Sequence, residues 1–468
     1  MVFSSVAFLF YFLPIALLLY YVAPQRWKNA ALLLISLFFY AWGEPIYILL
    51  LLFSSVVDYL NGLLMERYDH REKIRRLILV FSLIVNIGVL CFFKYAEFLI
   101  NSLNGLLGTC FAVLDLPLPI GISFYTFQTM SYMIDVYRRS VRAQRSFVGF
   151  AAFVSMFPQL VAGPIVRYDD IDKQLVSRKV TMDLFASGVR RFIIGLAKKV
   201  LLANNIGMLW DVTLAGSSEL TITGAWIGIL AFAFQIYFDF SGYSDMAIGL
   251  GRMLGFDFPE NFHYPYISKS ASEFWRRWHI TLGSWFRDYV YFPLGGSRVG
   301  QLRLLLNLFI VWFLTGLWHG ASWNFVLWGL YFGLLIALEK LWFGKWLEKV
   351  WRPFRHLYLM FALLIGWTLF AIEDMSALQH YLGVMFGFIQ TEGINGTNLY
   401  YLKTYGMLLL LLAFASTPVA ARLAAKLYSR MNSTVMAILE VIVLTILLIA
   451  STAYIIDDSY NPFLYFRF

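Results

Sequence analysis

Residues 304–338 read LLLNLFIVWFLTGLWHGASWNFVLWGLYFGLLIAL, a long apolar run. A helix needs about 20 mostly apolar residues to cross the hydrocarbon of a bilayer, so this run predicts two transmembrane helices, near 304–320 and 322–340. His319 lies inside the run, between Gly316 and Gly320. Because an imidazole is costly to place at bilayer depth, such a residue usually lines a cavity or a reaction path.

The rest of the chain has the same apolar character. Of its 468 residues, 60% are hydrophobic and 14% charged, and its mean hydropathy is +0.68. A soluble domain carries about 25% charged residues. Apolar runs recur along the whole length, and the alternating ten-residue segments of a β-barrel do not occur. We therefore expect an all-α, polytopic transmembrane bundle that forms one domain, 1–468. Further transmembrane helices are predicted near residues 3–22, 30–42, 46–65, 77–94, 118–137, 223–250, 357–373, 404–424 and 435–456.

The net charge of +9 is carried by Lys and Arg in short loops between apolar runs. This placement sets membrane topology and attracts anionic lipid, and it argues against a nucleic-acid partner. If the loops 26–28, 67–76 and 138–145 are cytoplasmic, the N-terminus lies outside the cytoplasm, in a multi-pass protein of the inner (cytoplasmic) membrane. Cys91 and Cys110 lack the spacing of a zinc site and give no support for a disulfide.

Three segments depart from simple spans. Basic residues flank 147–163 on both sides, and Pro158 and Pro164 interrupt it, so we expect a re-entrant or broken helix. The segment 190–212 is either a further span or an interfacial helix. The segment 252–303 alternates Arg and Lys with aromatic residues, which predicts helices at the cytoplasmic interface with their rings among the headgroups. In it, Glu273 and Arg277 have the i,i+4 spacing of a helical ion pair.

Four polar side chains are candidates for chemistry. His319 is the strongest, because an imidazole with an ordinary pKa near 6.5 can take and return a proton at neutral pH. His279 is either a second catalytic or orienting residue or a polar ring at the interface. Asp239 and Asp245 point about 120° apart on a helix, so they are no geminal acid pair. They are at least as well explained as partners of Arg or of the backbone.

Other features remain ambiguous or are missing. The cations from Arg276 to Arg298 suit the phosphates of coenzyme A, although on charge alone anionic lipid is the better explanation. Gly316 and Gly320 form a G-x-x-x-G pattern that usually means close helix packing. No P-loop, HExxH or G-x-S-x-G motif is present, so energy coupling by bound nucleotide has no support.

The chain resembles the membrane-bound O-acyltransferases, specifically the bacterial alginate O-acetyltransferase type, in motifs spread over nearly its whole length. These motifs are MVFSS (1–5), LPIGISFY (118–125), FPQLVAGP (157–164), FDFSGYSDMA (238–247), FWRRWHI (274–280), WFRDY (285–289), GLWHG (316–320) and NPF (461–463). The resemblance implies a helical bundle around a central funnel or tunnel. Its invariant histidine matches His319, and its second motif histidine matches His279. Many relatives carry a further His where this chain has Phe332, which leaves His319 as the base.

The resemblance implies an O-acyltransferase that passes acetyl from a cytoplasmic thioester, such as acetyl-CoA, through the membrane for O-acetylation of an extracytoplasmic polysaccharide. His319 is the expected general base, and His279 is expected to orient the donor or stabilise the oxyanion. Arg276, Arg277 and Arg287 are candidates for the carrier phosphates. Further candidates for substrate or donor binding are Trp278, Trp318, Asp239, Tyr243 and Asn324. No metal and no resident cofactor are expected.

Relatives of this type work with an extracytoplasmic serine-esterase-like partner, so the immediate acceptor is either the sugar or a hydroxyl on that partner. The sequence leaves the polymer open among alginate, cellulose, peptidoglycan and wall polymers. The alternative function is a transporter or flippase that carries an intact acyl donor across the membrane. A scaffold for polysaccharide export is a third possibility, and it predicts that His319→Ala leaves acylation intact.

Overall fold

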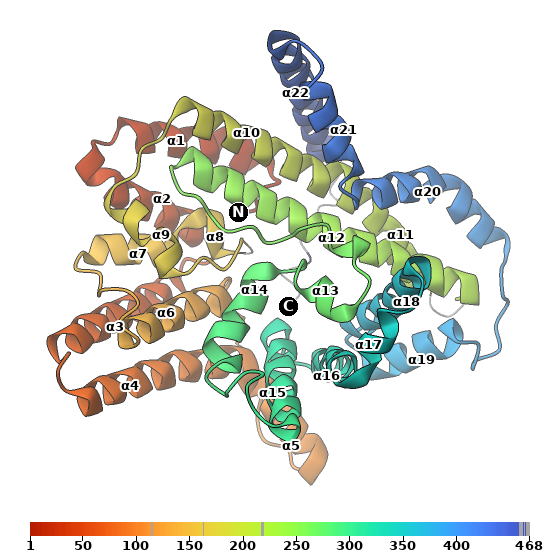
Figure 1. Cartoon of the computed structure of the whole chain (residues 1–468), viewed down its shortest axis with the longest axis horizontal. Coiled ribbons are helices and arrows are strands. Elements are labelled where there is room, and N and C mark those ends of the chain that lie inside the picture. Colours follow the sequence, from red (N-terminus) through yellow and green to blue (C-terminus); the bar gives the residue numbers. More distant parts are fainter. Residues whose placement is uncertain (114–115, 162, 217–219, 458–461, 463, 465–468) are drawn as a thin grey trace. The chain divides into compact units, whose positions relative to one another are not determined.

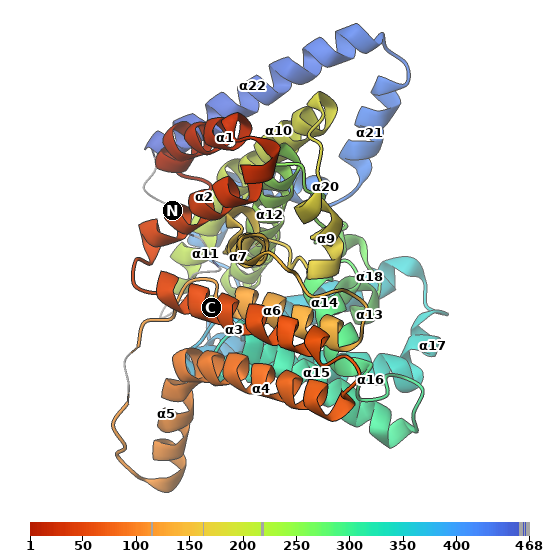
Figure 2. The same cartoon turned by 90° about the vertical axis from the view of Figure 1, so that its left-hand side faces the viewer.

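The computed structural model describes residues 1–113, 116–161, 163–216, 220–457, 462 and 464, and every regular element in these ranges is helical (Figures 1 and 2). Helices or continuous helical runs long and apolar enough to cross a membrane are Ile48–Arg67, Glu72–Leu107, Met182–Ala215, Ile222–Met253, Gln301–His319, Trp323–Leu347, Arg352–Ala371, Gly396–Ala415 and Ser433–Asp457. The protein is therefore an all-α, multi-pass membrane protein, as predicted. The undecided segment 190–212 lies within one of these runs.

The chain groups into two compact units. Unit 1 is Met1–Phe192 with Tyr243–Glu260, and unit 2 is Ile193–Gly242 with Asn261–Phe468. Two long helices, α10 (Met182–Ala197) and α12 (Ile222–Met253), contribute to both. That the whole chain acts as one domain stays a prediction.

Unit 1 is built around helices that pack through polar as well as apolar side chains. Its other helices are η1 (Ala7–Phe12), α1 (Leu13–Val22), η2 (Gln25–Trp27), α2 (Lys28–Gly43), α3 (Ile48–Arg67), α4 (Glu72–Leu90), η3 (Cys91–Tyr95), α5 (Ala96–Leu107), α6 (Ile122–Tyr137), α7 (Phe147–Ser155), α8 (Phe157–Leu160) and α9 (Tyr168–Val176). Helices α3, α4 and α6 lie side by side (Figure 2). The buried Asp58 accepts hydrogen bonds from Ser82 at 2.5 Å and Asn86 at 2.8 Å, and Thr129 donates to Asn86 at 3.0 Å. This network joins the three helices where no water is available to satisfy the groups.

The segment 147–163 is a broken helix, as predicted. Helix α7 ends at Ser155, Met156 is not helical, and the four-residue α8 follows. Protein surrounds this segment, since every side chain from Gly149 to Leu160 is buried. Gly121, in a left-handed conformation at the start of α6, brings its backbone so close to Leu160 that a Cβ would lie 2.5 Å from that residue's carbonyl oxygen. Two of the quoted motifs therefore meet at this glycine. Ala162 of the second motif lies outside the described residues.

Unit 2 holds both candidate histidines, His279 and His319. Its other elements are η4 (Lys198–Asn204), α11 (Asn205–Ala215), η6 (Pro265–Ile267), α13 (Ala271–Trp275), α14 (Ile280–Phe286), η7 (Arg287–Tyr291), α15 (Gln301–His319), α16 (Trp323–Leu338), η8 (Glu339–Phe343), α17 (Gly344–Leu347), α18 (Arg352–Ala371), α19 (Met375–Met385), α20 (Gly396–Ala415), α21 (Val419–Tyr428) and α22 (Ser433–Asp457).

Helices α15 and α16 are joined by the short segment 320–322 and form a hairpin whose arms touch at glycines. A Cβ on Gly316 would lie 2.3 Å from the carbonyl oxygen of Phe325 and 3.3 Å from the Cα of Gly329. A Cβ on Gly329 would in turn lie 2.4 Å from the carbonyl oxygen of Trp312. The close-packing interpretation of the G-x-x-x-G pattern is therefore correct for Gly316.

Two sequence predictions need correction. The predicted span 404–424 is two helices, because α20 ends at Ala415 and α21 begins after Pro418, which cannot donate the backbone hydrogen bond that a continuous helix requires. In 252–303 the rings do not point outward among headgroups. Most of them, including Phe274, Trp278 and Trp285, are buried in protein, because short helices fold this segment back on itself.

Candidate active site

A cavity of about 320 Å³ lies in unit 2, between the segment 272–287 and helices α15 and α16. Its lining residues are Ser272, Trp275, Arg276, His279, Ile280, Leu282, Gly283, Ser284, Phe286, Arg287, Val311, Trp312, Thr315, Ile336 and Lys340. Eight of these fifteen residues are apolar and seven are polar or charged, so the cavity offers both kinds of contact that a small-molecule site uses. It includes three of the residues that the sequence selected: His279, Arg276 and Arg287.

Three cations share this cavity. Arg276 follows α13 and is exposed, and its side chain makes no ion pair or hydrogen bond with any part of the chain that the structure describes. Arg287 pairs with its neighbour Asp288 at 2.7 Å, which raises the pKa of Arg287 through the hydrogen bond between them. Lys340 lies in η8, directly after α16, and its Nζ donates to the hydroxyl of Tyr291 at 2.9 Å. The cavity therefore carries positive charge that one carboxylate balances only in part.

Arg277 is directed elsewhere. Its Nη2 lies 3.1 Å from Glu273, which confirms the predicted i,i+4 pair, and its Nη1 lies 3.0 Å from a ring nitrogen of His263. Arg277 does not line the cavity. Of the three predicted phosphate-binding arginines, Arg276 and Arg287 line the cavity and Arg277 does not.

His279 sits in a tight turn. Its backbone is left-handed, with φ 42° and ψ 53°, a conformation that costs a non-glycine residue about 1 kcal/mol or more. Two backbone hydrogen bonds hold the turn: Ile280 donates to the carbonyl of Asn261 at 3.0 Å, and His263 donates to the carbonyl of Arg277 at 2.9 Å. Backbone strain of this kind is found mainly at active sites and ligand-binding sites, where a side chain must be held in one orientation.

The hydrogen bonds of His279 define which nitrogen carries its proton. The Oδ1 of Asn261 accepts from the backbone N–H of Thr281 at 3.3 Å, so the atom in that position must be the oxygen. The Nδ1 of His279, 3.1 Å from the same oxygen, must then donate, which leaves Nε2 unprotonated in the neutral ring. Burial lowers the pKa of His279 to about 3, so the ring is neutral at physiological pH.

His319 is the last residue of α15, at the turn of the hairpin rather than in the middle of a span. Its side chain is 6% exposed. Rings surround it, with centroids at 5.0 Å for Trp318, 4.9 Å for Trp328 and 5.3 Å for Phe370. Protein, not lipid, therefore solvates this imidazole. The Trp318 ring also lies 5.7 Å from that of His279, so one indole contacts both histidines.

The family model of the membrane-bound O-acyltransferases matches residues 34–370. The chain belongs to this family. It is 44% identical to a probable alginate O-acetylase AlgI of Azotobacter vinelandii, over 83% of this chain and 78% of that protein. It is 38% identical to a protein of the same name from Pseudomonas putida, over 100% of both. It is 34% identical to the peptidoglycan O-acetyltransferase of Helicobacter pylori, over 86% of this chain and 82% of that protein. The chain is therefore an acyltransferase, as predicted.

Asp239 and Asp245 of this acyltransferase are engaged in ion pairs. The buried Asp239 lies 2.7 Å from the Nζ of Lys199 and also accepts the backbone N–H of Leu464 at 3.2 Å. Within unit 1, Asp245 lies 2.8 Å from Arg191. Asp245 is therefore the partner of an arginine, as interpreted, whereas Asp239 is the partner of a lysine and of a backbone N–H group. Asp239 is not one of the residues that line the cavity.

Three of the remaining candidates make packing contacts within their own units. The amide of Asn324 donates to the carbonyls of Leu369 and Phe370 at 3.2 Å and so holds the end of α18 against α16. Trp278 is 3% exposed, with its ring 4.9 Å from that of Trp367. Tyr243 belongs to unit 1, where it stacks on Phe3 with a centroid distance of 4.5 Å.

Sequence reasoning missed two neighbours at the end of α16. Lys340 supplies the third cation of the cavity. The buried carboxylate of Glu339 accepts the backbone N–H groups of Ala271 at 2.7 Å and Ser272 at 2.8 Å. Glu339 thus satisfies the N-terminus of α13, the helix that carries the cavity wall. The only sequence signal was a Glu-Lys pair directly after an apolar run, which is usual at the end of any membrane helix.

Proposed function

We propose that this protein transfers an acetyl group from a cytoplasmic thioester donor, acetyl-CoA, toward an extracytoplasmic polysaccharide. The observation that carries the proposal is the cavity in unit 2, which combines the neutral His279 with three cations in a chain of the acyltransferase family. His319 does not line this cavity, and the ring of Trp318 lies between it and His279. The names of the alginate and peptidoglycan O-acetylating relatives support acetyl as the group and polysaccharide as its destination.

The lining of the cavity suits a thioester with a phosphorylated carrier. Arg276, Arg287 and Lys340 would bind its phosphates, since guanidinium and ammonium groups make charge-assisted hydrogen bonds to such oxygens. The apolar side chains of Leu282 and Ile336 would contact the carrier's uncharged arm. Because His279 is unprotonated at Nε2, it accepts a hydrogen bond there, which favours orienting the donor over stabilising an oxyanion.

His319 is proposed as the general base. It would take the proton of the acceptor hydroxyl as the oxygen attacks the thioester carbonyl, forming a C–O bond. Collapse of the tetrahedral intermediate breaks the C–S bond, and the thiolate leaves with the proton that His319 returns. Its aromatic surroundings exclude water and so limit hydrolysis of the thioester.

The proposed setting is the inner membrane, with the N-terminus outside the cytoplasm and the basic loops inside. The acceptor hydroxyl is either on the polymer or on an extracytoplasmic serine-esterase-like partner that completes the transfer. Acetylation of polymer at full rate by the purified protein alone would remove the partner from the proposal.

The test uses cells of the native host with matched membrane levels of wild type, His319→Ala and His380→Ala. His380 is an exposed histidine on α19 and serves as the control. We expect ester-linked acetyl on the extracellular polysaccharide to be lost in His319→Ala alone. Normal acetyl in His319→Ala would refute the assignment of the base and favour a scaffold.

A second measurement separates the enzyme from a transporter. Membrane vesicles receive acetyl-CoA labelled both in the acetyl group and in the adenine ring. Transfer of acetyl label without movement of adenine label supports the enzyme. Adenine label appearing on the far side would instead establish transport of the intact donor.

A further inference from the structure

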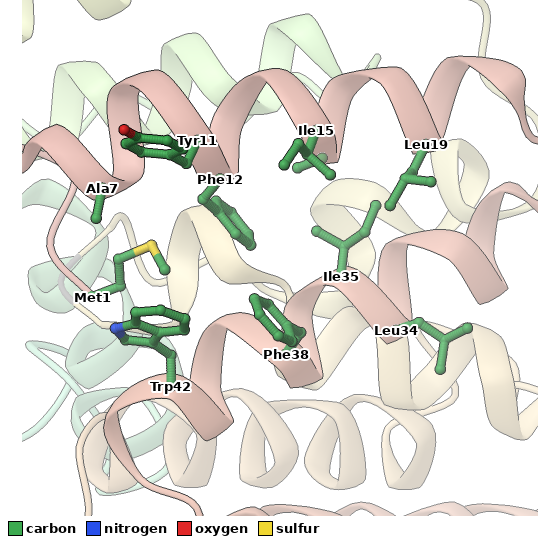
Figure 3. A pocket seen from close by; sticks show the side chains of 11 residues that line it. Met1, Ala7, Tyr11, Phe12, Ile15, Leu19, Leu34, Ile35, Phe38 and Trp42 are labelled. Atoms are coloured by element: carbon green, nitrogen blue, oxygen red, sulfur yellow. The ribbon is translucent and has the colours of Figure 1, made fainter.

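A second cavity, in unit 1, has a different chemistry. It is a groove of about 580 Å³ between η1–α1 and α2, and each of its eleven lining residues is apolar or aromatic (Figure 3). Figure 3 shows Tyr11 and Ile15 from one side and Phe38 and Trp42 from the other directed into the same space. Tyr11 is 67% and Trp42 61% exposed, whereas Phe12 and Ile35 are buried, so the groove has an open rim and a closed floor. In a membrane protein such a surface meets hydrocarbon chains.

Positive charge lies beyond one end of the groove. The chain turns there from α1 to α2 through Arg26 and Lys28. The Nζ of Lys28 lies 5.0 Å from the ring centre of Tyr20, and the guanidinium of the buried Arg178 lies 5.5 Å from the same ring. Neither Lys28 nor Arg178 forms an ion pair with a carboxylate in the described part of the chain. The guanidinium of Arg178 donates to the hydroxyl of Tyr20 at 2.6 Å and to Oδ1 of Asn29 at 2.7 Å, but neither acceptor carries a negative charge. An anion beside Lys28 would therefore offset the repulsion between the two cations.

The distance between the charge and the far end of the groove matches one lipid. Lys28 and Trp42 are fourteen residues apart on α2, which is about 21 Å along the helix axis. A bilayer is about 40–45 Å thick including headgroups, so one phospholipid reaches about 20–22 Å from its headgroup to the end of its chain. The basic end and the apolar groove therefore have the spacing of a headgroup and an acyl chain.

We propose that this groove binds one acyl chain of an anionic glycerophospholipid, whose phosphate is held at Lys28 above the charge of Arg178. The site is separate from the cavity in unit 2 and does not depend on the proposed reaction. A neutral lipid would fill the groove without using the charge, and a free phosphate would use the charge without filling the groove.

The test uses full-length protein in detergent micelles and two probes, phosphatidylglycerol and phosphatidylcholine with brominated acyl chains. Bromine quenches tryptophan fluorescence on contact, and the difference between wild type and Trp42→Phe isolates the signal of Trp42. We expect half-maximal quenching of Trp42 at about fivefold less phosphatidylglycerol than phosphatidylcholine, the effect of about one basic residue near an anionic surface.

Two variants separate the charge from the groove. Lys28→Gln should remove the preference for phosphatidylglycerol, while Lys73→Gln, which changes an exposed lysine on α4, should leave it intact. Ala7→Phe fills the groove and should weaken quenching by both lipids, whereas Leu18→Phe, on α1 but outside the groove, should not. Equal quenching by the two lipids, or no quenching of Trp42 by either, overturns the proposal.

Discussion

The glycine contact inside the α15–α16 hairpin gives a prediction that links packing to activity. In Gly316→Ala the new methyl group would lie 2.3 Å from the carbonyl oxygen of Phe325, where ordinary contact begins at 3.4 Å. The opposing atom is backbone and cannot rotate away, so the hairpin must open by about 1 Å, at a typical overpacking cost of about 1–3 kcal/mol. His319 is three residues further along the same helix and moves with it.

We expect Gly316→Ala to fold with a lowered thermal midpoint and to lose acetyl transfer by about a hundredfold, because a misplacement of about 1 Å at a catalytic group costs that much. Thermal unfolding of the purified protein and acetyl transfer at equal membrane abundance are the two measurements.

The matched control is Gly406→Ala in α20, where no atom lies within 4 Å of the new Cβ. Both variants gain the same helix propensity, about 1 kcal/mol, so their difference isolates the contact with Phe325. If Gly316→Ala is as stable and active as Gly406→Ala, the hairpin does not fix the position of His319, and the reasoning fails.

Three further predictions concern buried polar groups. Asp239→Ala leaves Lys199 buried without its carboxylate partner and should lower the free energy of unfolding by about 3–5 kcal/mol. The double variant Asp239→Leu/Lys199→Met should regain most of this stability in thermal unfolding. Equal loss of stability in both variants would exclude the ion pair as the cause. Asn261→Ala removes the acceptor for Nδ1–H of His279 and should slow acetyl transfer about tenfold or more, with Asn261→Asp less affected because it keeps an acceptor. Because the pKa of His279 is lowered, this side chain binds a proton below pH 6.5 in the unfolded chain but stays unprotonated down to about pH 3 in the folded chain. Stability should therefore be complete above pH 6.5 and fall by up to about 1.4 kcal/mol per pH unit below it. His279→Gln should lack this part of the pH dependence, and an identical dependence in both proteins would contradict the assignment.

The helices were largely predictable because the signal for each one lies within its own segment of the sequence. A run such as 304–338 has no arrangement in a membrane other than helix, and its break at 320–322 is visible as Gly320 and Ser322 beside the histidine. The i,i+4 pair of Glu273 and Arg277 was also predictable from local spacing, because the turn that follows α13 continues the coiling of the chain and keeps the two side chains on one side. The break at Pro418 also had a local signal, which the apolar residues on either side concealed.

The site was predictable only in part, because its surroundings come from distant segments. The rings near Trp278 are buried by residues such as Tyr237 and Trp367, so alternation of charge and aromatics could not distinguish a headgroup surface from a protein core. Asn261 lies eighteen residues before His279 in the sequence, and its Oδ1 determines which ring nitrogen of His279 carries the proton. A composition argument identifies the histidine but cannot provide the acceptor that orients it.

Glu339 and Lys340, in the first turn of η8 directly after α16, contribute to both the shape and the charge of the cavity. Glu339 binds the N-terminal N–H groups of α13, and that helix presents Trp275 and Arg276 to the cavity. The next residue, Lys340, reaches the same cavity from the opposite wall. Since the two residues are adjacent, any shift of this turn moves a cation and the wall opposite it together. His319, the last residue of α15, lies beside the opposite end of α16, so a change at Glu339 should leave its aromatic surroundings intact. We therefore expect mutation to separate the proposed donor binding from the proposed proton transfer.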